Sequence, residues 1–524
     1  MHLQLALVVA GLAGFLALSY EILWFRIYGF LTGGAPSSFG VVLGVYLFGI
    51  ALGSLVVRHW CKEGDATGQA QRLIVPAWLI LLATVGGWLL LPGVAELVRT
   101  QNYKWSLLGV GLVAGLTGAV LPLVAHFGIA ADARAGERLS WLYLANILGC
   151  TVGSLTTGFV LMQFCSTAQI ALILALSGLA VTALLALAAQ TSSRGRVAWT
   201  VALLAMAGGL VGANGRAYDF LYEKLLFKQA WPQGEHFAHV LENRSGVINV
   251  SQDSRIFGSG MYDGVFNTDL VDDRNMIIRA YAVCGMRATY KEALMIGLSS
   301  GSWAQVIANS PAVEKLTIVE INPGYPEIAK RFPGVASVFH NPKVTFVYDD
   351  GRRWLSAHPE RRFDLVVQNT TWHWRGHITN LLSQEYLQLV KARLQPNGVF
   401  FWNTTWSAPA QKTGCNVFGH GFRLINFMAT SDAPLVLDKA LWRQRLLQYT
   451  IDGKPVFDLH NSHHLRRLEE VLAFADRLPG GNEHTDVERC QSLANRMLTV
   501  PFVTDDNMAT EWGRPWDAMP VGGD

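Results

Sequence analysis

Residues 293–323 read ALMIGLSSGSWAQVIANSPAVEKLTIVEINP. Two short apolar runs, 292–297 and 315–320, lie on either side of a helical stretch, which predicts a strand, a helix and a second strand. The same alternation continues downstream, with expected strands at 343–348, 363–368 and 398–402. Strands that alternate with helices favour a parallel, doubly wound sheet. The sequence therefore predicts an α/β domain built around this stretch.

Small or acidic residues follow the first three of these strands. The first runs into GLSSGS (297–302), whose small residues let the backbone approach a ligand at the start of a helix. The second ends at Glu320, at a spacing that suits two ribose hydroxyls. The third ends at Asp349, Asp350 and Gly351, where a carboxylate can accept from an exocyclic amine such as that of adenine. Each acid alone is typical of a solvated strand end or a helix cap, but together at one sheet edge they indicate a nucleoside site.

The fourth strand stops in an aromatic and polar loop, VVQNTTWHWRGH (366–377). Trp372 offers an aromatic face for stacking or cation–π contact. His373 or His377 can serve as a base, because histidine titrates near neutral pH. Arg375 can bind an anionic acceptor. The alternative interpretation is that the Trp side chains pack the loop onto the sheet and the His side chains are solvated.

These stretches resemble the spermidine synthases and the wider S-adenosylmethionine methyltransferase fold. The resemblance rests on three stretches of the sequence: residues 293–323, VTFVYDDGRRWL and RFDLVVQN. Upstream, MYDGVFNTDLVDD resembles the β-hairpin lead-in of aminopropyltransferases, with Asp263, Gly264 and Asn267 near the family's Asp-Gly and Gln. FVTDDNMATEW near the C-terminus fits the same group, and the apolar half resembles bacterial multi-pass proteins fused to such a domain.

The resemblance implies a donor substrate, S-adenosylmethionine or its decarboxylated form. Glu320 would hold the ribose, and Asp350 with Gly351 would hold the adenine, with Asp349 beside it. The donor's tail would lie along the loop after the first strand, at Gly297, Ser299, Ser300 and Gly301.

The chain departs from the family where the chemistry lies. Ser300 stands where the family has an Asp that helps to hold the donor's ammonium. Asn369 and Trp372 stand where it has carboxylates that deprotonate and orient the amine. An amide cannot take a proton as a carboxylate does. We therefore place the catalytic candidates in the rebuilt loop, at Asn369, Trp372, His373 and His377.

The first part of the chain is too apolar for a soluble domain. Seven segments are long enough, or nearly so, to span about 30 Å of hydrocarbon. Glycines at four-residue spacing (Gly40 and Gly44, Gly49 and Gly53, Gly149 and Gly153) predict close helix packing. Glu21 and Arg26 fall near the expected end of the first span, where they can snorkel to the interface. The spans are 3–23, 38–57, 73–92, 105–129, 139–163, 168–190 and 197–213.

The predicted fold is an N-terminal all-α transmembrane bundle of about seven helices, followed by a C-terminal α/β, Rossmann-like methyltransferase-fold domain with a small β lead-in. We expect a multi-pass protein of the bacterial inner (plasma) membrane. Loop charges do not decide on which side the C-terminal domain lies. The expected boundaries are a transmembrane domain at 1–213, a linker at 214–243, the lead-in at 244–285, the Rossmann domain at 286–435 and a helical extension at 436–524.

Composition limits the partners. A net charge of +3 over 524 residues argues against a general nucleic-acid binder, and the absence of any CxxC pair argues against a structural zinc site. We expect no metal. The expected partners are the lipid bilayer and a small-molecule or membrane-associated acceptor, with further copies of the chain or a membrane protein as the alternatives for a protein partner.

Three functions stay open. The first is a membrane-anchored transferase acting on an acceptor that the sequence does not identify. The second is a genuine polyamine aminopropyltransferase with relocated acids. The third is a catalytically inactive ligand-sensing or assembly platform, which an extracytoplasmic domain would favour, because the donor nucleoside is made and kept in the cytosol.

Overall fold

The computed structural model describes residues 3–61, 73–189, 192–232, 234–508 and 511. The described residues form two compact units. The helical unit runs to His236 and also includes Glu242–Val247, whereas the α/β unit comprises Phe237–Leu241 and the residues from Ile248 onward.

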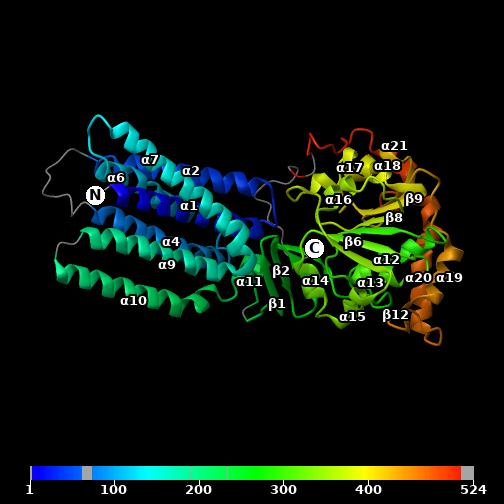
Figure 1. Ribbon diagram of the computed structural model, residues 1–524. Helices are drawn as coiled ribbons and strands as arrows, with labels where there is room; N and C mark the ends of the chain where they lie inside the picture. Colours follow the sequence, from blue (N-terminus) through cyan, green and yellow to red (C-terminus); the bar gives the residue numbers. More distant parts are fainter. Residues whose placement is uncertain (1–2, 62–72, 190–191, 233, 509–510, 512–524) are drawn as a thin grey trace. The chain divides into compact units, whose positions relative to one another are not determined.

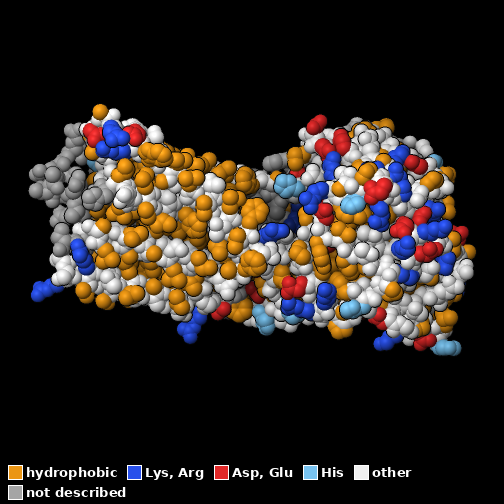
Figure 2. Space-filling view, in the orientation of Figure 1, with side chains coloured by type: hydrophobic (Ala, Val, Ile, Leu, Met, Phe, Trp, Pro, Cys, Tyr) orange, Lys and Arg blue, Asp and Glu red, His pale blue; other side chains and the backbone are white. Residues whose placement is uncertain are grey.

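The helical unit contains seven helices, among the described residues, that are long and apolar enough to cross a membrane. This confirms the predicted number of spans. Large apolar side chains such as Phe48, Leu112 and Leu204 are about two-thirds exposed, and hydrophobic side chains cover the visible face of this unit (Figure 2). Apolar surface of this extent is typical of contact with lipid. One of the seven, Tyr103–Gly128, is made of two consecutive helices, α5 and α6. The main helices are α1 (Leu3–Leu31), α2 (Ser37–Val57), α4 (Ile74–Leu97), α5 (Ser106–Gly118), α6 (Val120–Gly128), α7 (Ala135–Leu155), α9 (Thr167–Ala189) and α10 (Ser193–Tyr218), followed by the short α11 (Leu221–Phe227).

Glycines bring two pairs of these helices into close contact. A Cβ at Gly53 of α2 would lie 1.9 Å from the carbonyl oxygen of Gly115 in α5, and one at Gly149 of α7 would lie 1.9 Å from that of Gly11 in α1. Only glycine permits backbones to approach this closely. Their partners Gly49 and Gly153 are equally crowded, but a Cβ at Gly40 or Gly44 would meet nothing within 4 Å. The packing prediction thus holds for two of the three glycine pairs.

Helix α1 is longer than expected, which changes the environment of its two charged residues. It ends at Leu31, so Glu21 lies about 15 Å before the helix end, and Glu21 is only 5% exposed. The prediction that Glu21 snorkels to the interface is therefore wrong. Arg26 forms an ion pair with Glu242 at 3.5 Å, and Glu242 also accepts a hydrogen bond from the Thr167 hydroxyl.

The α/β unit begins with a small antiparallel sheet, as the sequence predicts. Its strand order is β1-β2-β3-β4. Ile248, Val250 and Ile256 of this sheet pack against Ile328 of the short helix α14. The elements are β1 (His239–Asn243), β2 (Gly246–Val250), β3 (Arg255–Gly258), β4 (Met261–Val265) and α14 (Gly324–Ala329).

The main sheet has eight strands in the order β14-β10-β11-β9-β8-β5-β6-β7 (Figure 1). The five strands that the sequence predicts form its parallel part. Strands β11, β10 and β14 continue the sheet as antiparallel partners beyond β9. The strands are β5 (Ala293–Ile296), β6 (Leu316–Glu320), β7 (Val344–Tyr348), β8 (Phe363–Gln368), β9 (Leu394–Asn403), β10 (His420–Leu424), β11 (Phe427–Ser431) and β14 (Val487–Arg489).

Helices cover both faces of this sheet. Alternate residues of β5 enter different cores: Ala293 and Met295 join one, and Leu294 and Ile296 join the other. This is why the strand is apolar throughout rather than alternating. The first core includes α12 (Ile278–Ala282), α13 (Ser302–Asn309), α19 (Lys439–Gln448) and α20 (Ser462–Arg477), and the second includes α16 (Gly351–Ala357), α17 (Gln384–Lys391), α18 (Ala408–Phe418) and α21 (Cys490–Arg496).

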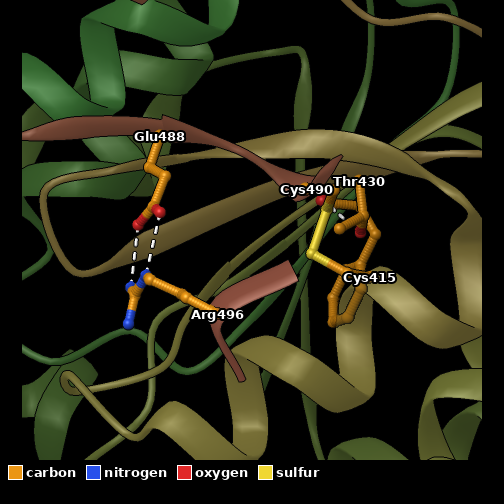
Figure 3. Close-up of a disulfide and its surroundings, with 6 residues drawn as sticks. Cys415, Thr430, Glu488, Cys490 and Arg496 are labelled. Atoms are coloured by element: carbon orange, nitrogen blue, oxygen red, sulfur yellow. Dashed lines mark hydrogen bonds and ion pairs between the residues drawn. A yellow bond between two sulfur atoms is a disulfide. The ribbon is translucent and has the colours of Figure 1, made fainter. Parts of the chain in front are cut away.

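The last part of the chain is more than the expected helical extension. It supplies β14 to the main sheet and a small hairpin, β12 (Thr450–Ile451) with β13 (Lys454–Pro455). A disulfide joins Cys415 of α18 to Cys490 of α21 (Figure 3). Next to it, Arg496 forms a bidentate ion pair with the buried Glu488 of β14. These contacts anchor the C-terminal segment to the second core.

Candidate functional site

The strand order reverses between two loops at one edge of the main sheet. After β5 the chain builds β6 and β7 on one side, and it then returns to build β8 and β9 on the other. In open α/β sheets, ligands bind outside the carboxyl ends of the strands where the order reverses. The loops that border this point are 297–302, after β5, and 369–377, after β8.

Backbone geometry requires glycine in the first loop. Gly297 has φ +86°, and a Cβ there would lie 2.4 Å from the carbonyl oxygen of Asn369. Gly301 has φ +79° and precedes α13. Ser299 also adopts a left-handed conformation, with φ +52°, which is unfavourable for a residue with a side chain. The loop is therefore held in a tight turn directly beside the loop after β8.

Serine hydroxyls tie this turn to the small sheet. Ser299 donates to the carbonyl oxygen of Asp263 at 2.6 Å, and Ser302 donates to that of Val265 at 2.9 Å. Ser300 donates to the Ser302 hydroxyl at 2.9 Å and is 4% exposed. Ser300 thus uses its hydroxyl within the loop, whereas an Asp at this position would bring a charge.

Glu320, the last residue of β6, lies beside the loop after β5. Its two carboxylate oxygens accept hydrogen bonds from the backbone N–H groups of Leu298 and Asn322, both at 2.7 Å. Burial raises the pKa of Glu320 to about 7, although these two hydrogen bonds act in the opposite direction. Each oxygen keeps a second lone pair. The carboxylate therefore fixes the loop after β5 and still has acceptors for a ligand.

The acids after β7 lie at the same edge, because Glu320 pairs with Tyr348 in the parallel register. Asp350 caps α16 by accepting from the backbone N–H of Arg353 at 2.8 Å, and Asp349 forms an ion pair with the Arg353 guanidinium. A Cβ at Gly351 would lie 2.5 Å from Ile296. Asp350 thus caps α16. Its carboxylate also lies at the same carboxyl edge of the main sheet as Glu320.

An amide network holds the start of the loop after β8. Asn403, at the end of β9, donates to the side-chain oxygen of Asn369 at 3.3 Å. The Asn403 oxygen accepts from the backbone N–H of Thr405 and from the side chain of Asn426. Arg279, which is buried, donates to the Asn426 oxygen. Asn369 is therefore oriented by a network that joins the loop after β8 to the end of β9.

His373 is the histidine that this network positions. Its backbone N–H donates to the Thr405 hydroxyl at 2.9 Å, and its Nδ1 lies 3.0 Å from the Thr405 carbonyl oxygen. The same Nδ1 lies 2.9 Å from the Thr405 hydroxyl oxygen, so Thr405 fixes the orientation of the imidazole ring through both its carbonyl and its hydroxyl. Thr405 and Trp406 both have positive φ angles, +44° and +67°. Strain at consecutive residues is typical of functional loops.

The other residues of the loop have different environments. His377 is exposed and adopts φ +68° at the start of a 3-10 turn (Ile378–Leu381). Trp374 is 6% exposed, which agrees with the packing interpretation, and Trp372 is half-buried. Arg375 donates to the Thr371 hydroxyl at 2.8 Å. The structure therefore distinguishes the two candidate bases: the rest of the fold orients His373, and His377 lies at an exposed turn.

Asp263 and Tyr325 form a pair beside these loops. The Tyr325 hydroxyl donates to the Asp263 carboxylate. Burial raises the pKa of Asp263, and the nearby Arg375 guanidinium and the Tyr325 hydroxyl oppose that rise. From the sequence, Asp263 belongs to the lead-in motif and is one of the acids, with Asp269, Asp272 and Asp273, that the polyamine alternative would use, whereas no sequence signal indicates Tyr325. Asn403 and Thr405 could have been found, since they follow the last of the predicted strands.

Over the described ranges, no group of three or more His, Cys, Asp or Glu side chains is arranged to hold a metal ion.

A family model described as "Spermine/spermidine synthase domain" matches residues 277–413, which include both loops and all three acids. The C-terminal part of this chain contains a spermidine synthase domain. The chain is 25% identical over 399 residues to "Polyamine aminopropyltransferase 2" of Streptomyces coelicolor, covering 73% of this chain and 70% of that protein. It is 24% identical over 399 residues to "Polyamine aminopropyltransferase" of Mycobacterium tuberculosis, covering 73% of each.

The matches to a plant enzyme and to a solved structure cover a smaller part of this chain. "Spermidine synthase 1" of Pisum sativum is 29% identical over 178 residues, covering 32% of this chain and 53% of that protein. The crystal structure of spermidine synthase from Thermotoga maritima matches 47% of this chain and 85% of its own, with 15% identity and a TM-score of 0.35. The fold assigned to the spermidine synthase domain here rests on its own strand order and on the family match.

Proposed function

We propose that this chain is a membrane-anchored transferase whose spermidine synthase domain takes decarboxylated S-adenosylmethionine as donor. The observation that carries the proposal is the buried Glu320 carboxylate, which bridges the backbone of Leu298 and Asn322 at the switch point of the sheet. A buried acid held in this way presents two acceptors to a ribose. The family match over 277–413 supports the same donor class.

In the proposed reaction the acceptor amine attacks the aminopropyl carbon next to the donor's sulfonium. A carbon–nitrogen bond forms, the carbon–sulfur bond breaks, and methylthioadenosine leaves with the electron pair of that bond. The amine loses one proton. The His373 imidazole, which Thr405 orients, takes this proton as general base. The remaining work of the site is to position donor and acceptor.

The acceptor side favours an amine other than a simple polyamine. Ser300, Asn369 and Trp372 carry no charge, so the loop lacks the anions that would attract a di- or tricationic chain. Arg375 adds a positive charge beside Asp263. We propose an acceptor whose amine belongs to a larger, membrane-associated or anionic molecule. The seven apolar helices support an anchor in the bacterial inner membrane.

Calorimetric titration of the full-length protein in lipid nanodiscs tests the donor site. Decarboxylated S-adenosylmethionine, S-adenosylmethionine and methylthioadenosine are titrated separately. We expect micromolar binding with preference for the decarboxylated donor, and at least tenfold weaker binding in Glu320→Ala and Asp350→Ala. Glu327→Ala, which removes an exposed acid of α14, is the matched control. A folded protein that binds none of the three nucleosides would contradict the proposal.

One observation favours a second candidate, a non-catalytic platform outside the cytosol. The Cys415–Cys490 disulfide lies in the spermidine synthase domain, and structural disulfides are rare in the reducing cytosol. The test is to trap thiols in intact cells with a membrane-impermeant alkylating reagent, with and without an impermeant reductant. Labelling of Cys415 and Cys490 only after impermeant reduction supports the platform. Two reduced thiols that react only with a permeant reagent support the transferase.

A further inference from the structure

The helical unit contains a buried acid for which its own side chains provide no partner. Glu21 of α1 is 5% exposed, and no hydrogen bond or ion pair joins it to another described residue. The nearest cation in sequence, Arg26, is already bound to Glu242 and to the carbonyl oxygen of Asn243. An ionisable side chain at this depth in a transmembrane helix is costly, and it is usually retained for function.

Two further polar groups around Glu21 also lack partners. The indole N–H of Trp24 and the hydroxyl of Tyr46 are buried and have no hydrogen-bond partner. Trp24 lies three residues after Glu21 and therefore on the same face of α1. The Trp24 and Tyr46 ring centroids are 6.0 Å apart, so Trp24 of α1 lies against Tyr46 of α2. Three unpartnered groups thus converge where α1 meets its neighbours.

Aromatic rings complete this cluster. Tyr20 stacks on Trp24 with a centroid distance of 6.2 Å, and its own hydroxyl is bound to the Thr84 carbonyl oxygen. The cluster is therefore one carboxylate, one unpartnered hydroxyl, one unpartnered indole N–H and three aromatic side chains. This is the set of groups that recognises an ammonium ion, because the carboxylate supplies counter-charge and the rings attract a cation through their negative faces.

We propose that Glu21, Trp24 and Tyr46 form a binding site for a protonated primary amine within the helical unit. The ammonium N–H groups donate to the Glu21 carboxylate and to the Tyr46 oxygen, and the methylene groups of the amine pack against Tyr20 and Trp24. A bound cation offsets the cost of burying the ionised Glu21 carboxylate. This site is separate from the donor site, and the inference does not depend on the proposed transfer reaction.

The amine site is tested with full-length protein in nanodiscs and with n-butylammonium chloride as probe. n-Butanol, which has the same chain but no charge, is the matched ligand control. Binding is measured by calorimetry, and thermal unfolding is followed in parallel. Glu21→Gln keeps the size of the side chain and removes its charge. Glu137→Gln removes an exposed carboxylate of α7 and is the matched control variant.

We expect n-butylammonium to bind and to raise the unfolding temperature, and n-butanol to do neither. Glu21→Gln should bind the amine at least tenfold more weakly, and Tyr46→Phe about threefold more weakly, whereas Glu137→Gln should bind it as the unchanged protein does. If the unchanged protein binds no amine, or if Glu21→Gln binds it equally well, the proposal is overturned. If Glu21→Gln does not fold, the affinities of Tyr46→Phe and Trp24→Phe for n-butylammonium are compared with that of the unchanged protein, and equal affinities overturn the proposal.

Discussion

The two loops that meet at the edge of the main sheet are built by different means. The loop after β5 is fixed by backbone geometry: glycines in left-handed conformations, serine hydroxyls on backbone carbonyls, and the Glu320 carboxylate on two backbone N–H groups. The loop after β8 is fixed by side chains, in which Asn403 and Thr405 hold Asn369 and His373. Backbone-built geometry tolerates little change, whereas a network of side chains can be altered one residue at a time.

This difference explains where the chain resembles its relatives and where it departs from them. In the proposed site a nucleoside would be recognised through the turn and the strand-end acids, at Gly297, Glu320, Asp350 and Gly351. The acceptor side would depend on the side chains that follow β8. The resemblance to the family implies carboxylates there, at the positions of Asn369 and Trp372. If this difference holds, substitutions in the loop after β5 should affect donor binding, and substitutions in the loop after β8 should affect transfer.

The largest expected effect is on the acceptor side. His373→Ala should lower the rate of transfer by about 10²- to 10⁴-fold, the usual contribution of a general base, and leave the donor affinity within about twofold. Rates and calorimetric affinities measured on the same preparation check this. His377→Ala is the matched control, because His377 is exposed, and it should keep the rate. Equal losses in both variants would mean that neither histidine acts as the base.

On the donor side, Gly297→Ala should destabilise the spermidine synthase domain by about 3 kcal/mol. The new Cβ would lie 2.4 Å from the Asn369 carbonyl oxygen in a backbone with φ +86°, and both overpacking and a left-handed side chain are unfavourable. Urea unfolding followed by tryptophan fluorescence measures the loss. Gly334→Ala, at a position where a Cβ meets nothing within 4 Å, should change stability by less than about 0.5 kcal/mol. Similar values for the two variants would refute the tight turn.

The pKa of Glu320 predicts opposite pH trends for stability and for donor binding. Burial raises the pKa to about 7 in the folded protein, whereas an unfolded Glu titrates near pH 4.3. The stabilising effect of the bound proton is therefore complete below about pH 4.3 and is lost as the pH rises through 7. Ribose hydroxyls donate to the ionised carboxylate, so donor affinity should rise about tenfold between pH 6 and pH 8.

Calorimetry at pH 6, 7 and 8 with the unchanged protein and with Glu320→Gln measures this trend. Gln does not titrate, so the variant should bind weakly and equally at all three values. A pH dependence that persists in Glu320→Gln would assign the titration to another group.

The smallest expected effect concerns the C-terminal segment. Arg352 of α16 forms a bidentate ion pair with Asp505, at 2.8 and 2.6 Å, and this hydrogen-bonded guanidinium lowers the pKa of Asp505. Arg352→Ala should cost about 0.5–1 kcal/mol, as partly exposed pairs do, and leave transfer unchanged. Arg331→Ala, in an exposed pair with Glu327, should cost less. A marked loss of transfer in Arg352→Ala would make the C-terminal segment part of the site.

The parallel strands and the seven apolar helices could be predicted from the sequence because their signals are local. β5 is apolar at every position since both of its faces are buried, and Glu320 and Asp350 lie at the edge that strand order alone implies. The roles of Asn403, Thr405 and Tyr325 could not be predicted, because they depend on contacts between elements far apart in the chain. Glu21 was misjudged for a similar reason: the length of α1 and the burial of Glu21 against neighbouring helices are not local properties.

The most direct test of the central claim is release of methylthioadenosine from decarboxylated S-adenosylmethionine by the full-length protein in nanodiscs. Methylthioadenosine is released in the transfer reaction regardless of which amine is the acceptor. The reaction is run with 1,4-diaminobutane and, separately, with an amine-containing membrane extract. We predict release with the extract, much slower release with 1,4-diaminobutane, and loss of both in His373→Ala. If the protein binds the donor yet releases no methylthioadenosine with either acceptor, the domain is not a transferase and the platform interpretation replaces it.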